Sequence, residues 1–259
     1  MQEPWSGLID AHCHLCDEEL LPQLDNEVAE ALQIGSTGFI SSALSKEEFE
    51  WIELTRLHTY HKYFRWSAGI HPYYDKSSEN DFSALVKLSE RKKIIALGEI
   101  GLDGRKYNTE WQKEILLKQL DLASSFDLPV IFHVVHNFYD LYKLLENNFP
   151  KVRGFLHGFN NSLDVAEHFS QFDLAFSLGC KPPKPEVVKF IIKHGFFLFE
   201  TDAPYQKPKS EPSQINHLKN LDFVVEEISR ISALSREKLI QMQKASFDKI
   251  FSISRNQDF

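Results

Sequence analysis

Two histidines that stand one residue apart, His12 and His14, end the first apolar run of the chain in the stretch LIDAHCHLC. Imidazole nitrogens are common metal ligands, and alternate side chains of a β-strand point to the same face, which places both rings on one side. An isolated HxH pair is equally compatible with two ordinary polar residues that bind no metal. Ligands from other parts of the chain must distinguish these two interpretations.

Four more potential ligands each follow a run of aliphatic and aromatic residues. They are Glu99 in LGEIGLD, His133 in VIFHV, His157 in FLHGF and Asp202 in FETDAPY. Nitrogen and oxygen donors together suit Zn²⁺, Mn²⁺, Co²⁺ or Mg²⁺, and four histidines argue against Mg²⁺ alone. Six donors are more than one catalytic zinc ion with an open position needs, so we expect two divalent metal ions that share a bridging carboxylate.

Such a site requires strands whose ends meet. Eight short β-rich runs alternate with longer segments, at residues 7–13, 37–43, 65–70, 93–100, 129–134, 152–158, 173–179 and 196–201. Helical periodicity marks residues 47–61, 109–126 with Thr109 as its N-cap, and 162–172. Strands that alternate with helices pair in parallel through right-handed crossovers, and eight such units in about 250 residues predict an α/β fold of the (β/α)₈ TIM barrel type. An open doubly wound sheet is the structural alternative, although the first turn, HCHLCDEEL, lacks the glycine-rich pattern typical of that fold.

The composition limits the partners and the location. The chain has 259 residues and a formal net charge of −8, so any phosphate-bearing substrate must be attracted by local positive charge. No repeat or linker divides it, and we expect a single domain over residues 1–259. No stretch approaches the roughly 18 apolar residues of a membrane span, and MQEPWSG lacks the features of a signal peptide. We therefore expect a cytoplasmic protein without a membrane partner, and we assume a monomer.

The three cysteines, Cys13, Cys16 and Cys180, are too few for a disulfide framework, and reduced thiols are the simpler interpretation. The CxxC pair of Cys13 and Cys16 has no companion that would complete a zinc ribbon. In a strand, Cys13 points away from the face that His12 and His14 share. We interpret the CxxC as incidental to the site.

Five sequence blocks in order from residue 8 to about residue 251 resemble the signature blocks of the TatD-like metal-dependent deoxyribonuclease family, within the amidohydrolase-like barrel superfamily. They are IDAHCHL, GIHPYY, GEIGLD, QKEILLKQLDLASSFDLPVIFH and FETDAPY. The resemblance implies a (β/α)₈ barrel that hydrolyses phosphodiester bonds in DNA, typically as an exonuclease from the 3′ end.

The resemblance also implies a role for each ligand. One metal would be bound by His12, His14, Glu99 and Asp202, and Glu99 would bridge to a second metal bound by His133 and His157. Two such ions can activate water and neutralise the leaving oxygen of an in-line displacement. Glu99 and Asp202 are therefore the expected catalytic residues, with Asp202 as the acceptor of the proton from water.

Substrate contacts are expected around these ligands. His71 in GIHPYY fits a phosphate contact better than metal binding, with a purely structural hydrogen bond as the alternative, and we group Asp103, Arg105 and Tyr205 with it as substrate-binding residues. Further lysines that follow predicted strands give local positive charge: Lys106, Lys181, Lys184, Lys207 and Lys209. Aromatic side chains in the same loops can stack on unpaired bases, namely Tyr73, Tyr74, Phe159 and Tyr205. The predicted partners are therefore DNA or RNA ends, in single-stranded form.

Three departures from the family pattern concern the substrate. HVVHNF has His136 near the position where relatives often have arginine, HGFNN replaces HCFSG, and Ser210-Glu211-Pro212 replaces Asn-Glu-Pro. An alternative function is hydrolysis of a small ester, lactone, phosphotriester or amide on the same barrel. Relatives with such activities often bridge their metals through a modified lysine at the end of the fourth strand, where this chain has Glu99, which favours the nuclease. A non-catalytic metal-binding scaffold is the third hypothesis.

Overall fold

The computed structural model describes residues 3–73 and 79–251. Within these ranges eight parallel strands form one sheet, in which each strand pairs with the next along the chain. They are β1 (Leu8–Cys13), β2 (Ser36–Ala43), β3 (Phe64–Ala68), β4 (Ala96–Asp103), β5 (Val130–Val135), β6 (Arg153–Leu156), β7 (Asp173–Leu178) and β8 (Phe197–Phe199). The predicted (β/α)₈ barrel is confirmed.

Hydrogen bonds at the carboxyl ends of β1 and β8 bring the first and last strands together. The Asp202 N–H donates to the His12 carbonyl at 2.9 Å, and the His14 N–H donates to the Ala203 carbonyl at 2.8 Å. The Thr201 N–H donates to Asp10 Oδ1 at 2.9 Å. Barrel closure therefore occurs at the residues that carry the predicted ligands.

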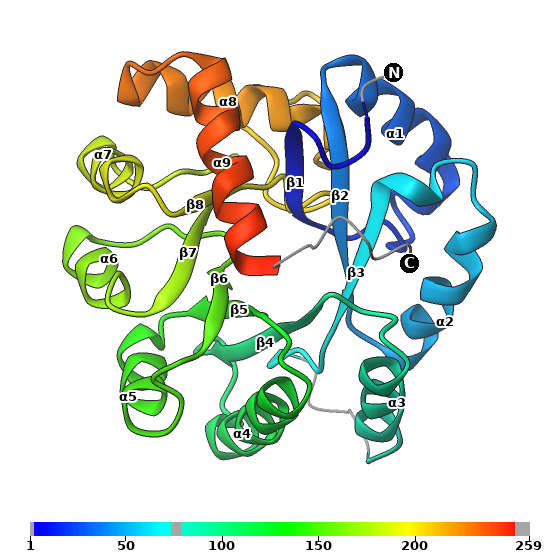
Figure 1. Ribbon diagram of the computed structural model, residues 1–259, viewed down its shortest axis with the longest axis vertical. Coiled ribbons are helices and arrows are strands. Elements are labelled where there is room, and N and C mark those ends of the chain that lie inside the picture. The colour runs from blue at the N-terminus through cyan, green and yellow to red at the C-terminus, as the bar shows by residue number, and fades with distance from the viewer. Residues whose placement is uncertain (1–2, 74–78, 252–259) are drawn as a thin grey trace.

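A ring of helices surrounds the strands (Figure 1). One helix follows each strand: α1 (Leu24–Gln33), α2 (Lys46–Leu54), α3 (Glu79–Glu90), α4 (Thr109–Ser125), α5 (Phe138–Asn148), α6 (Leu163–Phe169), α7 (Pro185–His194) and α8 (Leu221–Ser232). Helix α9 (Arg236–Phe251) is additional to this repeat. None of the helices in the described ranges is both long and apolar enough to cross a bilayer.

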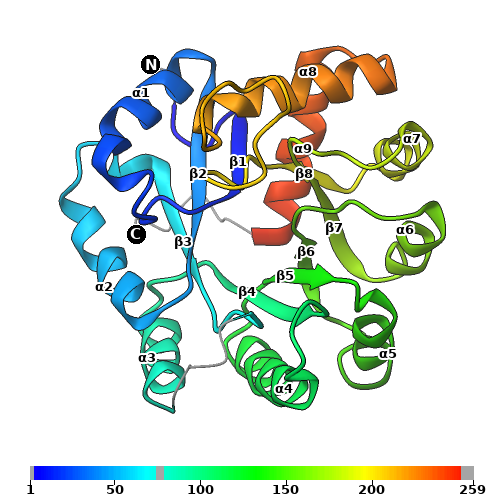
Figure 2. The same cartoon turned by 180° about the vertical axis from the view of Figure 1, so that it is seen from behind.

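Helix α9 covers the amino-terminal end of the barrel and lies across the near face in Figure 1. Gln243 bonds both backbone groups of Ile9, and Ser246 Oγ accepts from the Phe197 N–H at 3.2 Å. Phe247 and Ile250 pack on the apolar side chains that fill the barrel interior. Because this end is covered, the site must form at the opposite end, which faces the reader in Figure 2.

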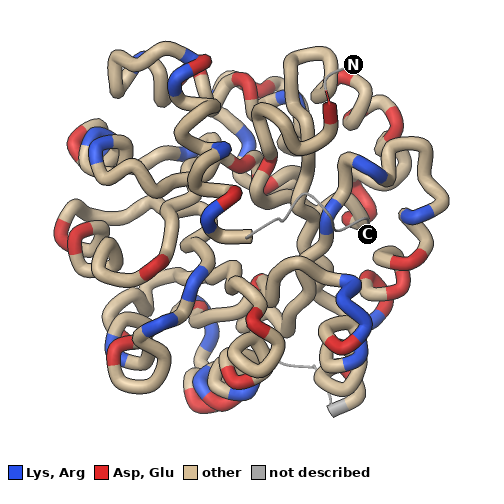
Figure 3. The backbone as a smooth tube through the Cα atoms, in the orientation of Figure 1, with Lys and Arg blue, Asp and Glu red and all other residues tan. Residues whose placement is uncertain are grey.

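A larger apolar core lies between the strands and the helices. All three cysteines are free and buried in it, and Cys13 Sγ faces the Ile40 carbonyl at 3.4 Å. Lys and Arg alternate with Asp and Glu around the ring of helices, as Figure 3 shows. The view agrees with the absence of an overall basic field.

Several predicted boundaries were wrong. The helix expected over 47–61 ends at Leu54, because the Thr55 hydroxyl bonds the Ile52 carbonyl and accepts from Trp66 Nε1, which competes with helical bonding. The helix expected over 162–172 ends at Phe169, and Thr109 is the first residue of α4 rather than its cap.

The fourth strand continues to Asp103, since Leu102 and Asp103 still pair with β5, so Glu99 lies inside a strand. Strand β8 is shorter than expected and ends before Glu200.

Candidate metal centre

A pocket of about 340 Å³ opens at the carboxyl ends of the strands. Five of the six predicted ligands line it, and His12 lies buried beside them. The side chains that line it and belong to the predicted site are His14, His71, Glu99, Arg105, His133, His157, Asp202 and Tyr205. Residues from six parts of the chain, in or after β1, β3, β4, β5, β6 and β8, thus converge at one end of the barrel.

Glu99 lies at the centre of the group. Its Oε1 is 3.2 Å from Nε2 of both His12 and His14. Its Oε2 is 3.1 Å from His133 Nδ1 and 3.0 Å from His157 Nε2. Each oxygen therefore faces one pair of histidines, an arrangement that suits a carboxylate between two cations.

Asp202 joins the pair formed by His12 and His14. Its Oδ1 is 3.4 Å from His14 Nε2 and 3.6 Å from His12 Nε2. Its backbone has a positive φ of 57°, a conformation that aspartate tolerates better than most residues, and its N–H is held by the His12 carbonyl. The closure of the barrel thus places this carboxylate on the same side as the two histidines.

The residues present fit divalent metal ions. His12 Nε2 is buried and makes no hydrogen bond within the described residues, although two carboxylates lie within 3.6 Å. Three groups of side chains each offer ligand atoms that lie within 4.8 Å of one another inside the group. They are His12, His157 and Asp202; His12, His14 and Glu99; and His71, Glu99 and His133. Buried imidazoles and carboxylates that face one another without complete hydrogen bonding are the donors of catalytic metal sites.

The charges of these groups depend on one another. Burial alone would raise the pKa of Glu99, but the charges of His157 and His12 hold that pKa well below its usual range. Burial would lower the pKa of His14, but hydrogen bonds with Asp202 and Glu99 raise it to about 10. The neighbouring carboxylates also raise the pKa of His157 against the effect of burial. A cation that binds here must displace protons from the imidazoles.

His71 is a buried member of the third ligand group, but its ring is oriented as a donor. Its Nδ1 accepts the Tyr73 N–H at 3.0 Å, and its Nε2 lies 3.5 Å from Glu99 Oε2. Burial lowers the pKa of His71 to about 4, so the ring is neutral near pH 7. Because Nδ1 is the acceptor, the proton of the neutral ring lies on Nε2, and this nitrogen has no lone pair for a metal.

Asp103 is fully buried and does not line the pocket. Its Oδ1 accepts from the Arg105 backbone N–H and from Arg105 Nε, both at 2.9 Å. Its Oδ2 lies 3.0 Å from His133 Nε2. The carboxylate therefore connects Arg105, which does line the pocket, to the back of His133. Arg105 and Lys106 also lie over the ring of Tyr73, at 5.2 and 3.9 Å from its centroid.

Tyr205 joins two loops above the site. Its hydroxyl donates to Asp17 Oδ2 at 2.7 Å, and its ring meets the ring of His14 edge-on at 5.3 Å. The proposed stacking role of Phe159 was wrong, because this ring is buried against Phe138 and Phe176. Tyr74 lies outside the described residues.

The lysines expected to supply local charge fall into two classes. Lys207 Nζ donates to the carbonyls of Glu211 and Ser213, and so holds its own loop together. Lys181, Lys184 and Lys209 are exposed.

Sequence reasoning missed residues that contact the ligands from behind. Ser42 Oγ lies 3.1 Å from His12 Nδ1, and Glu200 Oε1 lies 3.5 Å from His157 Nδ1. Asp10 is buried, which raises its pKa to about 8, and it accepts from both the backbone N–H and the hydroxyl of Thr201. Asp10 and Glu200 each stand two residues before a predicted ligand, and that spacing was an available signal.

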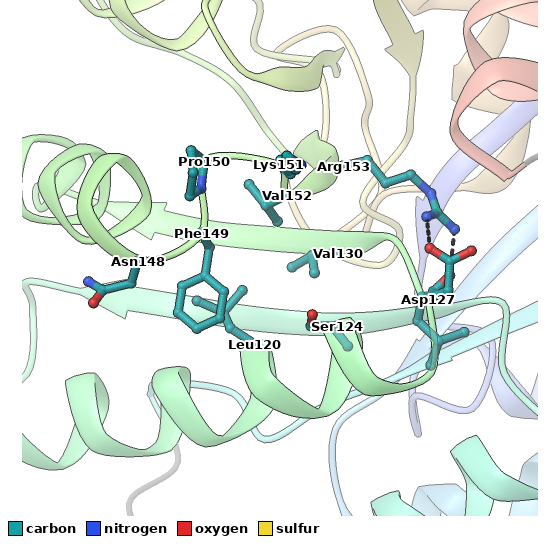
Figure 4. Close-up of a pocket in the computed structure, with 12 residues that line it drawn as sticks. Leu120, Ser124, Asp127, Val130, Asn148, Phe149, Pro150, Lys151, Val152 and Arg153 are labelled. Atoms are coloured by element: carbon teal, nitrogen blue, oxygen red, sulfur yellow. Dashed lines mark hydrogen bonds and ion pairs between the residues drawn. The ribbon is translucent and has the colours of Figure 1, made fainter.

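A second pocket, of about 400 Å³, lies beside α4 and the segment between α5 and β6 (Figure 4). Asp127 and Arg153 form an ion pair at its edge, and Arg153 Nε also donates to the Ile250 carbonyl at 3.2 Å. The residues that line it include neither histidine nor cysteine. Metal-binding side chains therefore gather at the first pocket.

The chain matches the family model described as TatD related DNase over residues 9–252. It belongs to the TatD family of metal-dependent hydrolases. Among solved structures, the crystal structure of YjjV, a TatD homologue from Escherichia coli, superposes with a TM-score of 0.87 at 26% identity and covers 95% of this chain and 98% of YjjV. The family resemblance inferred from the sequence blocks is confirmed.

The relatives of this TatD-family chain differ in what their names state. The metal-dependent hydrolase YjjV is 32% identical over 76% of this chain and 79% of its own length, and its name gives no substrate. Human TATDN3 is named a deoxyribonuclease and is 26% identical over 95% of this chain and 94% of its own. TatD of Pantoea ananatis is named a 3'-5' ssDNA/RNA exonuclease and is 24% identical over 95% of this chain and all of its own.

Proposed function

We propose that this TatD-family protein is a nuclease that hydrolyses phosphodiester bonds at the ends of single-stranded DNA or RNA, in the 3′ to 5′ direction, with two divalent metal ions. The observation that carries this proposal is Glu99, whose two oxygens each face a separate pair of histidines. The names of human TATDN3 and of TatD from Pantoea ananatis support the choice of substrate.

The ligand roles follow from this geometry. One ion would be held by His12, His14, Glu99 and Asp202, and the other by Glu99, His133 and His157. When bound, these ions supply positive charge that activates the attacking water and stabilises the leaving oxygen.

The carboxylate of Asp202 accepts the proton of the attacking water. It lines the pocket, and although burial opposes ionisation, the hydrogen bond with His14 and the nearby charge of His157 lower its pKa. It is therefore anionic when the reaction begins, as a general base must be.

Two other residues contact the phosphate group. His71 donates from Nε2, since its Nδ1 accepts the Tyr73 N–H. Arg105 supplies a charged donor that Asp103 holds in place. In this proposal Asp103 acts behind the pocket, as a support for Arg105 and His133, rather than on the substrate.

Exposed tyrosines around the pocket favour unpaired bases. Tyr73, Tyr107, Tyr139 and Tyr205 are exposed by 37%, 105%, 71% and 49%, and they follow β3, β4, β5 and β8. Aromatic rings beside positive charge are typical of surfaces that bind single strands, because every base has a face on which a ring can stack.

The test is an assay of the full chain, loaded with Mg²⁺, Mn²⁺ or Zn²⁺, on single-stranded DNA and RNA labelled at the 5′ end. We expect stepwise shortening from the 3′ end. Glu99→Gln and Asp202→Asn should each lower the rate at least ~100-fold, as is typical for loss of a catalytic acid–base or metal-bridging group. Asp17→Asn is the control, since this carboxylate at the same end of the barrel accepts the Tyr205 hydroxyl and the Glu19 N–H rather than facing a predicted ligand ring.

Turnover of an aryl ester or lactone without any shortening of nucleic acid would show that the substrate proposal is wrong and would favour the small-ester hydrolase. The far-ultraviolet circular dichroism of each variant should match the wild type, so that a loss of rate can be assigned to chemistry rather than to unfolding.

A further inference from the structure

Glu200 is a fully buried carboxylate that the proposed hydrolysis does not use. It follows β8 directly, and its backbone N–H continues the pairing with β7 by donating to the Leu178 carbonyl at 3.2 Å. Its Oε1 accepts the Gly158 N–H at 2.6 Å and lies 3.5 Å from His157 Nδ1. The side chain is thus placed behind a predicted metal ligand.

The two ring nitrogens of His157 have different surroundings. Nε2 faces the site, at 3.0 Å from Glu99 Oε2 and 3.2 Å from His133 Nδ1. Nδ1 faces Glu200, and within the described residues neither Nδ1 nor Glu200 Oε2 makes a hydrogen bond. A proton on Nδ1 would point at Glu200 Oε1 and give the buried nitrogen a partner, whereas a proton on Nε2 would leave the Nδ1 lone pair facing a carboxylate oxygen.

We propose that Glu200 is a positioning residue that holds the Nδ1 proton of His157 and so presents the Nε2 lone pair to the second metal position, next to Glu99. The proposal rests on the metal-ligand roles proposed above. A carboxylate behind a ligating histidine fixes the tautomer and the ring orientation and strengthens the ligand, and its loss costs about 10–100-fold in metal affinity.

The other ligands make this effect specific to one metal position. His133 Nε2 faces the Asp103 carboxylate at 3.0 Å, so both histidines of the second position have a carboxylate behind them. His12 Nδ1 instead faces the neutral hydroxyl of Ser42 at 3.1 Å, and that hydroxyl pairs with Ser67. Loss of Glu200 should therefore weaken the second ion and leave the first unchanged.

Calorimetric titration of the EDTA-treated full chain with Mn²⁺ tests this inference. We expect two bound ions in the wild type, and in Glu200→Gln a fall of about 10–100-fold in the affinity of only one of them. Glutamine keeps an oxygen that can accept the Gly158 N–H, so the loop contact is retained, but the oxygen that faces His157 Nδ1 loses its negative charge and becomes a weaker acceptor. Equal affinities in Glu200→Gln and the wild type, or an equal fall for both ions, would overturn the proposal.

Asp10→Asn is the matched control. Asp10 is also a fully buried carboxylate behind the site, but its partners are Thr201 and backbone N–H groups rather than a ligand ring. We expect this variant to melt at a lower temperature and to leave the second ion unaffected, because Asp10 supports the β1–β8 closure beside the first ligand group. A selective loss of the second ion in Asp10→Asn as well would overturn the specific role of Glu200.

A measurement on the wild type does not depend on the folding of Glu200→Gln. Long-range ¹H–¹⁵N spectra of the zinc-loaded, histidine-labelled chain report which nitrogen of each ring has the proton, and His157→Gln identifies the signal. We expect the proton on Nδ1, and a proton on Nε2 would overturn the proposal. Neither the Mn²⁺ titration nor the ¹H–¹⁵N spectra measure hydrolysis. A failure of the nuclease proposal would appear in the cleavage assay and would leave these two results unchanged.

Discussion

At the scale of single residues, the buried carboxylates of Glu99 and Asp202 differ in the histidines that they face. Glu99 distributes its oxygens between two pairs of histidines, while Asp202 approaches one pair and lines the pocket. The six predicted ligands could be picked out because each ends or follows an apolar run in the sequence, and the structure brings their side chains together. Ser42 and Glu200 could not be assigned in the same way, because their contacts with ring nitrogens depend on the alignment of neighbouring strands.

Metal binding should release protons, and the pKa of His14 predicts how the apparent metal affinity changes with pH. Its pKa of about 10 means that the ring is protonated at pH 7.5, whereas a ligating imidazole must be neutral. The apparent affinity for Zn²⁺ should therefore rise with pH as far as about pH 10. Calorimetry at pH 7.5 in two buffers with different ionisation enthalpies measures the protons released. Identical heats in both buffers would contradict the prediction, and His14→Ala should release fewer protons.

At the scale of elements, the alternation of apolar runs and helical segments was sufficient to predict all eight strands and their parallel order. The boundaries were harder. Nothing local in GEIGLD indicates that β4 continues past Glu99, since the extension is stabilised by pairing with Val134 and Val135 on β5. The end of α2 likewise involves a bond from Trp66 on β3, a contact that the helical pattern of the segment itself does not reveal.

Contacts between strands also predict that alanine substitutions at two glycines with positive φ will lower the free energy of unfolding by different amounts. A Cβ on Gly154 (φ +145°) would lie 1.9 Å from the Val130 carbonyl oxygen on β5, whereas a Cβ on Gly35 (φ +99°) would meet nothing within 4 Å. We expect Gly35→Ala to lower the free energy of unfolding by about 1–2 kcal/mol through backbone strain alone. Gly154→Ala should cost more, about 3–5 kcal/mol, because the strands must also separate. Urea denaturation measures both, and equal losses would refute the packing argument.

At the scale of the whole molecule, the net charge of −8 is compatible with a polyanionic substrate only if local features at the rim attract it. At this end of the barrel, Arg105 and Lys106 both lie over the ring of Tyr73 and form one cluster with it. Tyr107 in the loop after β4 and Tyr139 in the first turn of α5 were not singled out from the sequence, because their exposure depends on how these segments leave the barrel.

The tyrosines Tyr107 and Tyr139 should each contribute to the affinity for a single strand. Tyr107→Ala and Tyr139→Ala should each weaken binding of a 12-nucleotide single strand about 5–100-fold, the range expected for loss of one base stack. Fluorescence anisotropy in EDTA measures binding without hydrolysis. Phe126→Ala is the control, because this ring is 38% exposed but follows α4, away from the pocket. Unchanged affinity in both tyrosine variants would exclude stacking at these positions.

The hydrogen bonds that join β1 to the end of β8 have a consequence for the timing of activity. Asp10 and Thr201, which are bonded to each other, stand 191 positions apart in the chain. His12 and Asp202 meet only through the same closure. A growing or truncated chain that lacks the segment after β8 cannot bring Asp202 beside His12. Under the proposed function, such a copy would have neither a complete first metal position nor its general base, and it would not act on the nucleic acids around it.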